Sequence, residues 1–306
     1  MKSKDLLSMA DLSREELDQI LSLASKMKRT DPGPVLKGKT LAMVFEKPSL
    51  RTKVSFDVAM YQLGGHAIYL SKEEVGLGKR EPIADAARVL SRYADLIMAR
   101  VFAHQSVVDL ARYASVPVIN GLSDLEHPCQ IVGDLLTIRE KKGKLEGVTV
   151  AYIGDGNNVA GSLLLGCALV GAEFRIASPK GYDLPAGIVR KAEEICRNGA
   201  RMMVAVRDPE EAARGADVVY TDVWTSMGQE AESEKRRRAF AGYQVTEKLL
   251  AQAKPDAILM HPMPVHWGEE LAEGLSECPQ SVLIDQAENR LHAQKAILAE
   301  ISKGKK

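Results

Sequence analysis

Short apolar runs alternate with longer segments of helical periodicity through the first half of the chain. Strand-length apolar runs lie at 41–45, 67–70, 96–99 and 116–119. Segments with the spacing of a helix that buries one face lie between them, near 50–63, 82–93, 105–114 and 128–141. Strands and helices that alternate in this way are typical of βαβ units, in which helices cover a parallel sheet.

A second series of the same kind follows the polar segment 141–147. We expect its strands at 148–153, 173–177, 202–206, 217–221, 257–260 and 281–284, with helices between them. The pattern therefore predicts an α/β fold of two open parallel-sheet domains, residues 1–143 and 144–286, with a final helix at 287–306 that packs back on the first domain. Because open sheets bind ligands beyond the carboxyl ends of their strands, we expect the site in an interdomain cleft.

The composition is that of an ordinary globular protein and disfavours several classes of partner. The 306 residues include 41 basic and 41 acidic side chains, so no one-signed surface is indicated for nucleic acid or for a membrane. No stretch reaches the ~18 apolar residues of a membrane helix. The 4 cysteines are scattered without a metal-like spacing. We expect a cytoplasmic protein with reduced cysteines and no metal site.

The segment Gly154–Asn158 is similar to a nucleotide-binding turn but is incomplete. Val159 stands where the pattern G-x-G-x-x-G requires its third glycine, and no Walker A pattern is present. A dinucleotide cofactor is therefore disfavoured, and we expect no cofactor. The basic run 235–238 follows three glutamates closely, and we interpret it as a solvated helix face.

Six polar clusters lie where predicted strands end. They are Ser49–Thr52, Arg100, His127–Gln130, Asp222–Gly228, His261–Pro264 and Glu288–Arg290. Taken singly, each has an ordinary explanation, such as a helix cap for Ser49 or a surface cation for Arg100. The first cluster also suits an anion, because a strand that turns into a helix directs free N–H groups and the positive helix dipole at one spot. Six such clusters at strand ends favour a ligand site over coincidence.

Four of these motifs together resemble one family. The segments Ser49–Thr52, His127–Gln130, Asp222 with Ser226–Gly228, and Asp285–Arg290 are similar in order and spacing to those of the aspartate/ornithine carbamoyltransferase family. The resemblance extends from about residue 5 to residue 300. Within that family, the Ser-Met-Gly loop is similar to the branch that uses ornithine.

The resemblance implies two sets of substrate-binding residues. For carbamoyl phosphate it implies Ser49, Leu50, Arg51, Thr52, Arg100, His127, Gln130, Pro262, Met263 and Arg290. For ornithine it implies Asn158, Asp222, Ser226 and Met227. The catalytic group that it implies consists of Arg51, Arg100, His127 and Asp222.

The reaction implied by the resemblance is carbamoyl transfer from carbamoyl phosphate to the δ-amine of ornithine, a step of arginine metabolism that gives citrulline and phosphate. A neutral amine attacks the carbamoyl carbon, an oxyanion forms against fixed donors, and phosphate leaves with the proton. Since such an amine has a free pKa of about 10.4, the site must lower that pKa or supply a base, and bound phosphate is the nearest candidate. The resemblance further implies a homotrimer or a multiple of trimers, with the loop near Lys79 and Arg80 reaching a neighbouring active site.

Three positions depart from the family pattern. Pro262 stands where ornithine enzymes usually carry a proton-accepting cysteine, although the backbone carbonyls at 262 and 263 can still accept hydrogen bonds. Leu50 replaces a commoner threonine, and Gly76 stands where a glutamine often contacts carbamoyl phosphate. Two alternatives therefore stay open. One is another acceptor, namely putrescine, lysine, an N-acylated ornithine or aspartate, and the other is a non-catalytic carbamoyl phosphate-binding paralogue.

Overall fold

The chain forms two compact units in the computed structural model, which describes residues 1, 3–196, 203–226 and 228–304. One unit comprises Met1–Leu136 with Glu288–Lys306, and the other comprises Thr137–Ala287. Each unit contains one sheet whose neighbouring strands are all parallel. The predicted α/β class with two parallel sheets is therefore confirmed.

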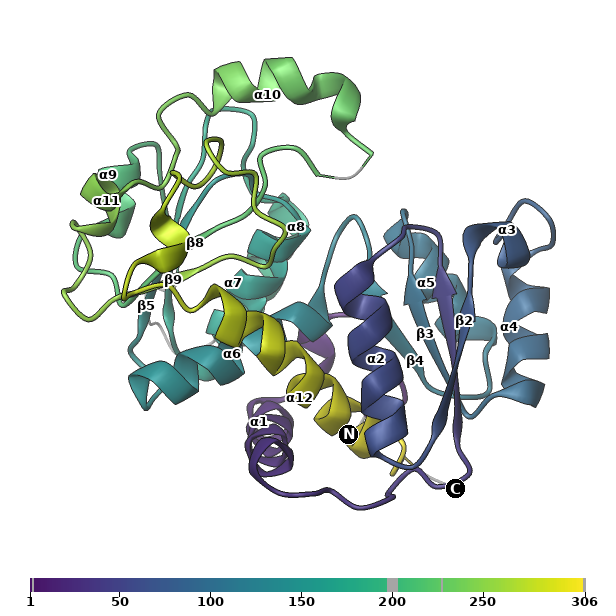
Figure 1. The fold of residues 1–306 in the computed structure, drawn as a ribbon. Coiled ribbons are helices and arrows are strands. Elements are labelled where there is room, and N and C mark those ends of the chain that lie inside the picture. The colour runs from purple at the N-terminus through teal and green to yellow at the C-terminus, as the bar shows by residue number, and fades with distance from the viewer. Residues whose placement is uncertain (2, 197–202, 227, 305–306) are drawn as a thin grey trace. The chain divides into compact units, whose positions relative to one another are not determined.

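The first unit is built on a sheet with the strand order β2-β1-β3-β4. Its strands are β1 (Thr40–Phe45), β2 (His66–Leu70), β3 (Leu96–Arg100) and β4 (Val118–Leu122). α4 (Ile83–Tyr93) and α5 (His104–Tyr113) share an apolar core with β1 and β3. α2 (Leu50–Gln62) lies on the opposite face of the sheet (Figure 1). Helices on both faces explain why the two central strands, β1 and β3, are almost entirely buried.

Three further elements belong to the first unit. They are η1 (Met9–Asp11), α1 (Arg14–Arg29) and α3 (Lys72–Val75). α6 (Pro128–Lys142) and α12 (Leu283–Ile301) are continuous helices that run past the residues at which the two units divide.

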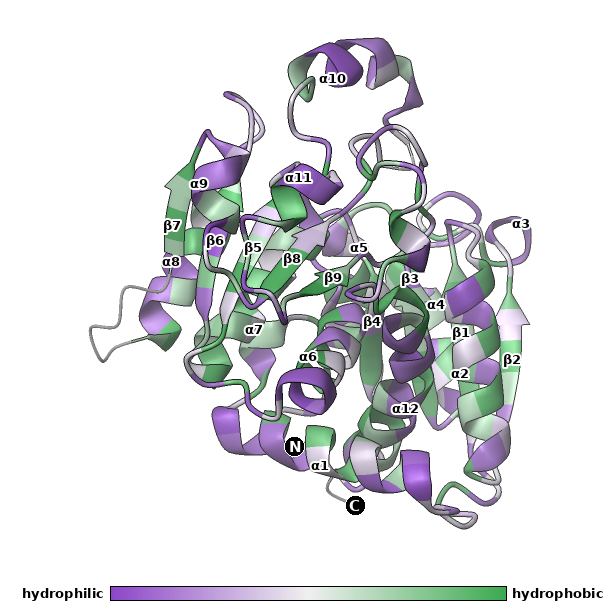
Figure 2. Ribbon diagram, turned by 60° about the vertical axis from the view of Figure 1, so that its left-hand side comes forward, coloured by the Kyte–Doolittle hydropathy of each residue, from purple (hydrophilic) through white to green (hydrophobic). Residues whose placement is uncertain are grey.

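The second unit has a sheet with the strand order β7-β6-β5-β8-β9. Its strands are β5 (Thr149–Ile153), β6 (Glu173–Ala177), β7 (Met203–Val206), β8 (Val218–Thr221) and β9 (Ile258–Met260). Its helices are α7 (Asn158–Val170), α8 (Ala186–Ile195), α9 (Pro209–Ala213), α10 (Ser233–Ala239) and α11 (Glu247–Leu250), with η2 (Glu230–Glu232) and η3 (Leu275–Glu277). One core cluster joins β5 and β8 to α9 and α11. The strands of both sheets are mostly green, that is hydrophobic, in Figure 2.

The strand order of each sheet reverses direction at one point between two neighbouring strands. In the first unit the chain moves outward from β1 to β2 in one direction and from β3 to β4 in the other, so β1 and β3 flank a topological switch point. In the second unit β5 and β8 flank the equivalent point. Ligands of open α/β sheets bind at such points, because the loops on the two sides diverge there. We therefore expect the polar residues that follow β1, β3, β5 and β8 to be the ones that bind a ligand.

The strand expected at 281–284 is wrong. Ser281 forms only an isolated bridge with Leu259, and α12 already begins at Leu283 rather than at 287. Arg290 consequently lies inside a helix instead of following a strand. Periodicity could not separate the two possibilities, because a short apolar run fits a strand and a helix start equally well.

The strand expected at 116–119 lies at Val118–Leu122 instead. Its second half contains Asn120 and Gly121, which disguise it as a loop in the sequence. Asn120 is fully buried and donates from Nδ2 to the carbonyl of Leu7 at 2.9 Å. A β-carbon at Gly121 would collide with Met98 Sδ on β3, so a larger residue there would require the Met98 side chain to move.

No helix in the described ranges combines the length and the apolar character that a membrane-spanning segment needs.

Candidate functional site

The turn from β1 into α2 forms as predicted and presents a helix N-terminus. Ser49 is the N-cap of α2, and its Oγ accepts from the backbone N–H of Thr52 at 3.3 Å. Thr52 is fully buried and Arg51 is half-buried, whereas Leu50 is 75% exposed. Backbone N–H groups and the positive end of the helix dipole lie together here, which favours an anion.

Two further arginines belong to the same unit. Arg100 ends β3 in register with Phe45 of β1, so it lies beside the start of the β1–α2 turn. Arg290 of α12 donates from Nη2 to Thr52 Oγ1 at 2.8 Å. The structure therefore brings Arg290, which is distant in sequence, into direct contact with the residues of that turn.

The electrostatics of Arg100 indicate a missing negative charge. Burial, reinforced by the positive charges of Arg290 and Arg51, lowers the pKa of Arg100 to about 9. Only 5% of Arg100 is exposed, and its Nε has no hydrogen-bond partner among the described residues. A buried cation surrounded by other cations is costly, and a bound dianion would supply the missing opposite charge. This part of the first unit can therefore bind a phosphate group.

His127 and Gln130 lie at the start of α6 in the same unit. His127 is buried, and burial together with Arg290 and Arg100 keeps its pKa well below the usual value. It is therefore neutral near pH 7 and can act as a hydrogen-bonding group without adding charge. Gln130 donates from Nε2 to Asp134 Oδ1 at 2.9 Å. That bond leaves the carbonyl end of the Gln130 side chain for another donor.

Cys129 lies between these two residues but is not a reactive thiol. Burial raises the pKa of its thiol to about 12. Its Sγ contacts the carbonyl of Asn120 at 3.4 Å. Because the thiolate is the nucleophilic form, the first unit offers charge and hydrogen bonds at this point rather than a covalent nucleophile.

Asp222 immediately follows β8 in the second unit. Gly154 follows the neighbouring strand β5 at the same level, because Ile153 pairs with Thr221. The residue is only 7% exposed, and burial raises its pKa above the usual value. Its Oδ2 accepts from Asn157 Nδ2 at 2.7 Å, and its Oδ1 accepts from the backbone N–H of Val223 at 2.8 Å. The carboxylate is thus held in one orientation, where it can bind a cation such as an ammonium group.

Sequence reasoning selected Asn158 and missed Asn157. Asn157 is the N-cap of α7, and its Oδ1 accepts from Val159 N and Ala160 N, both at 3.0 Å. The same side chain donates to Asp222, so it links the helix start to the carboxylate. Asn158 is the first residue of α7 and is half-buried. The preference of asparagine for N-cap positions was the available signal.

The segment after Asp222 carries the other predicted ornithine residues. Ser226 is half-buried, and its N–H donates to Gln229 Oε1 at 3.2 Å. Met227 lies outside the described residues. Trp224 is buried and stacks on Phe240, with their ring centroids 5.7 Å apart. The segment is therefore anchored at Trp224, two residues before Ser226, to the C-cap residue of α10.

The basic run 235–238 is not uniformly solvated, so that interpretation is wrong for Arg236. Arg236 is 6% exposed and donates from Nη1 to Asp155 Oδ2 at 2.7 Å and to the carbonyl of Trp224 at 3.0 Å. Arg237 and Arg238 form exposed pairs with Glu269 and Glu234. The sequence could not indicate which arginine turns inward, because four adjacent basic residues have no helical periodicity.

Substituting Arg236 with methionine is expected to destabilise the protein by about 3–5 kcal/mol, since Asp155 would be left as an unpaired buried charge. The free energy of unfolding from urea titration measures this loss. The double variant Arg236→Met with Asp155→Asn should recover most of it. An equally unstable double variant would show that the loss comes from packing instead of charge.

The last polar cluster follows β9. His261 is fully buried and Pro262 is buried beside it, whereas Met263 is half-buried. The backbone N–H of His261 donates to Gln286 Oε1 at 2.8 Å, which ties the end of β9 to the first turn of α12. The carbonyl groups at 262 and 263 thus belong to a turn whose first residue, His261, is fixed by a hydrogen bond at the end of β9.

Among the described residues, His266, Glu269 and Glu270 form a group whose possible ligand atoms lie within 4.8 Å of one another. Two of these groups already have partners. Glu269 Oε1 accepts from Arg237 at 2.9 Å, and Glu270 Oε1 accepts from the backbone N–H of His266 at 2.7 Å. We therefore assign no metal to this group.

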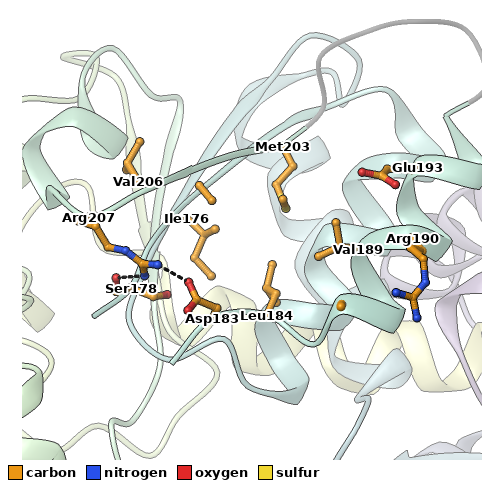
Figure 3. A pocket seen from close by; sticks show the side chains of 12 residues that line it. Ile176, Ser178, Asp183, Leu184, Val189, Arg190, Glu193, Met203, Val206 and Arg207 are labelled. Atoms are coloured by element: carbon orange, nitrogen blue, oxygen red, sulfur yellow. Dashed lines mark hydrogen bonds and ion pairs between the residues drawn. The ribbon is translucent and has the colours of Figure 1, made fainter. Parts of the chain in front are cut away.

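A pocket of about 340 Å³ lies elsewhere in the second unit (Figure 3). Its lining comes from β6, β7 and α8 and is largely apolar, with Arg207 paired to Asp183 at 2.7 Å. None of the predicted substrate residues lines it. It lies away from the β5–β8 switch point, so it is not the candidate site.

The lowered pKa of Arg100 predicts a pH dependence for anion binding. Below about pH 9 Arg100 is charged in the free protein, whereas above that pH a bound dianion must first draw a proton onto it. The dissociation constant for inorganic phosphate should therefore rise about tenfold per pH unit above pH 9. Calorimetric titration from pH 7 to 10.5 measures this. The Arg100→Gln variant should bind weakly with no such rise.

Comparison with known proteins gives a consistent result for both units. The family model described as "Aspartate/ornithine carbamoyltransferase, carbamoyl-P binding domain" matches residues 4–140. The model described as "Aspartate/ornithine carbamoyltransferase, Asp/Orn binding domain" matches residues 146–301.

Curated relatives match over nearly the full chain. A protein of Archaeoglobus fulgidus named ornithine carbamoyltransferase is 55% identical over 302 residues, covering 97% of this chain and 97% of its own. One of Pyrococcus furiosus named "Ornithine carbamoyltransferase, anabolic" is 51% identical over 308 residues, covering 99% and 98%. A solved structure of ornithine carbamoyltransferase from Pyrococcus furiosus has a TM-score of 0.95 at 52% identity, covering 99% of this chain and 98% of that one.

Proposed function

Because the chain belongs to the aspartate/ornithine carbamoyltransferase family, we infer that it transfers the carbamoyl group of carbamoyl phosphate to the δ-amine of L-ornithine, giving L-citrulline and phosphate. The observation that carries this function is the match, at 51–55% identity and over at least 97% of the chain, to relatives named ornithine carbamoyltransferase. The name of the Pyrococcus furiosus relative includes the word anabolic, which supports a role in arginine biosynthesis.

The carbamoyl phosphate site that we propose takes most of its residues from 1–143 and from α12. Ser49, Leu50 through its N–H, Arg51 and Thr52 bind the phosphate group, together with Arg100. His127, Gln130 and Arg290 bind the carbamoyl end. The buried, mutually repelling guanidinium groups support this assignment, because a dianion relieves their repulsion. As negative charge develops on the carbamoyl oxygen, Arg100, Thr52 and neutral His127 supply donors that are already in place.

The ornithine site that we propose lies in residues 144–286. Asp222 binds the terminal amine, and Asn158, Ser226 and Met227 bind the remainder of the amino acid. The hydrogen bond from Asn157 supports the role of Asp222, because it fixes the orientation of the carboxylate. The δ-ammonium must lose its proton before attack, and the phosphate group of bound carbamoyl phosphate is the base that we propose for it. The attacking nitrogen loses its second proton to the phosphate that departs.

Because Pro262 stands at the position of the usual cysteine, no thiol is available there to accept a proton. We propose that the carbonyl groups of Pro262 and Met263 accept from the carbamoyl NH₂ and that amine activation proceeds without a cysteine. Proline loses only its donor, so its carbonyl oxygen remains available.

Product formation from carbamoyl phosphate tests the function. The acceptors are ornithine, N-acetylornithine, putrescine, lysine and aspartate, each followed from pH 6 to 10 with this protein and with Pro262→Cys as the matched control. We expect citrulline from ornithine alone, and the Cys variant should reach its maximal rate at a lower pH. Turnover with a different amine would show that the protein is a carbamoyltransferase for that acceptor instead. Absence of any product, with carbamoyl phosphate still bound, would favour the non-catalytic paralogue.

The assembly that we propose is a homotrimer or a multiple of trimers in the cytoplasm. Exposed apolar side chains on the first unit support self-association, since Leu50, Val54 and Tyr61 of α2 and Ile68 of β2 are 75%, 50%, 81% and 40% exposed. Light scattering after size-exclusion chromatography measures the mass. A monomer of 33.4 kDa would contradict the proposal.

A further inference from the structure

We propose that His261 and Glu270 are positioning residues that hold the Pro262–Met263 turn in the shape its carbonyl groups need to accept from the carbamoyl nitrogen. The inference rests on the proposed function and deepens it. Neither side chain is assigned a contact with substrate, so both act through the backbone of the turn.

The hydrogen bonds of His261 define its tautomer. The backbone N–H of Met263 donates to Nδ1 at 2.9 Å, so Nδ1 carries no proton. The proton is therefore on Nε2, which lies 3.1 Å from Glu270 Oε1 and donates to it. The carboxylate thus sets the tautomer, and the tautomer supplies the acceptor that the turn requires.

The turn is one that needs such support. Met263 has φ = 55°, and it is the only non-glycine residue with positive φ in the described part of the chain. A conformation of this kind costs about 1–3 kcal/mol and persists only where surrounding contacts determine it. Because Pro262 has no N–H, the N–H of Met263 is the first backbone donor after His261, and it is used entirely for this contact.

Burial makes the pair rigid. His261 and Glu270 are both 0% exposed. Glu270 Oε1 also accepts from the backbone N–H of His266, and the backbone carbonyl of Glu270 accepts from Val245 N at 2.9 Å. Glu270 Oε2 has no hydrogen-bond partner among the described residues. A buried carboxylate with one unsatisfied oxygen is unfavourable for stability, whereas its other oxygen is committed to His261 and to the backbone of His266.

Two substitutions of His261 separate its two nitrogens. His261→Asn places an acceptor near the position of Nδ1 and lacks the Nε2 donor, whereas His261→Gln places a donor near Nε2 and lacks the Nδ1 acceptor. We expect the Asn variant to bind carbamoyl phosphate nearly as well as the unchanged protein. The Gln variant should bind it about 3- to 10-fold more weakly and turn it over about 10²-fold more slowly, because the carbamoyl group is displaced.

Inorganic phosphate is the internal control, since it lacks the carbamoyl nitrogen. Its dissociation constant should be the same in the unchanged protein and in both variants. Equal behaviour of the Asn and Gln variants toward carbamoyl phosphate would overturn the proposal. A parallel weakening of phosphate binding would also overturn it, because general damage to the fold would then explain the loss.

Glu270 supplies a second, independent pair. Glu270→Gln keeps a carbonyl oxygen for His261 and His266, so it should retain most of the turnover, whereas Glu270→Ala should reproduce the His261→Gln defect. An alanine variant with unchanged turnover would refute the positioning role. If the unchanged protein makes no citrulline, the proposed function fails. The ratio of the dissociation constants for carbamoyl phosphate and inorganic phosphate still tests whether His261 and Glu270 position the turn.

Discussion

Replacing Asp222 with asparagine is expected to lower kcat/KM for ornithine by about 10²–10³-fold, because removal of one partner from a buried charge pair costs about 2–5 kcal/mol. The substitution preserves the shape of the side chain and leaves an oxygen that can accept from Asn157. Steady-state kinetics with each substrate varied in turn measure the effect. The dissociation constant for inorganic phosphate should not change, and a large change in it would contradict a role confined to the amino acid.

The same variant should be more stable than the unchanged protein at neutral pH. Burial raises the pKa of Asp222 in the folded state, so its ionised form opposes folding. The carboxyl group therefore contributes most to stability below the unfolded pKa of about 3.9, and that contribution is lost as the pH rises through the folded value. The stability gain from asparagine should be larger at pH 7 than at pH 4. Urea unfolding at the two pH values measures the gain. A larger gain at pH 4 would contradict the claim that the ionised carboxylate opposes folding.

Replacing Arg100 with glutamine is expected to lower kcat/KM for carbamoyl phosphate by about 10²–10³-fold, the usual consequence of removing one fixed donor to a developing oxyanion. Arg100 combines burial, two neighbouring positive charges and an unsatisfied Nε, which suit it to a dianionic substrate. Arg88 provides a matched control, because it is an exposed arginine of the same unit whose side chain pairs with Asp85 at 3.0 Å. Arg88→Gln should leave the kinetics unchanged.

Stability should again move in the opposite direction to activity. The pKa of Arg100 is lowered in the folded state, so its stabilising contribution is present only above the unfolded pKa and is lost as the pH falls through about 9. Without a ligand at pH 7, the Arg100→Gln variant should therefore be at least as stable as the unchanged protein. Phosphate should stabilise the unchanged protein by about 2.7 kcal/mol at 100 times its dissociation constant and the variant by much less. Equal stabilisation of both would refute the charge argument.

Most of the architecture could be predicted from periodicity. The strands at 41–45, 96–99, 148–153 and 173–177 all lie within one residue of observed strands, because each is a continuous apolar run between polar turns. The run at 281–284 failed, since Val282 and Leu283 are buried in either a strand or a helix start. Arg290 could still be chosen as a candidate site residue, because the resemblance identified it without reference to its secondary structure. In the structure it donates to Thr52 and helps to lower the pKa of Arg100.

The sequence by itself determined the two parallel sheets and the polar residues at their carboxyl edges, because apolar periodicity is local and strands that run parallel must end together. Only the tertiary structure decided which polar neighbours act together. Asn157 and not Asn158 holds Asp222, Arg236 and not Arg237 is buried against Asp155, and Glu270 orients His261. In each case adjacent residues of the same chemical type are equivalent in sequence. Burial and contacts between distant segments distinguish them, and neither is encoded by local pattern.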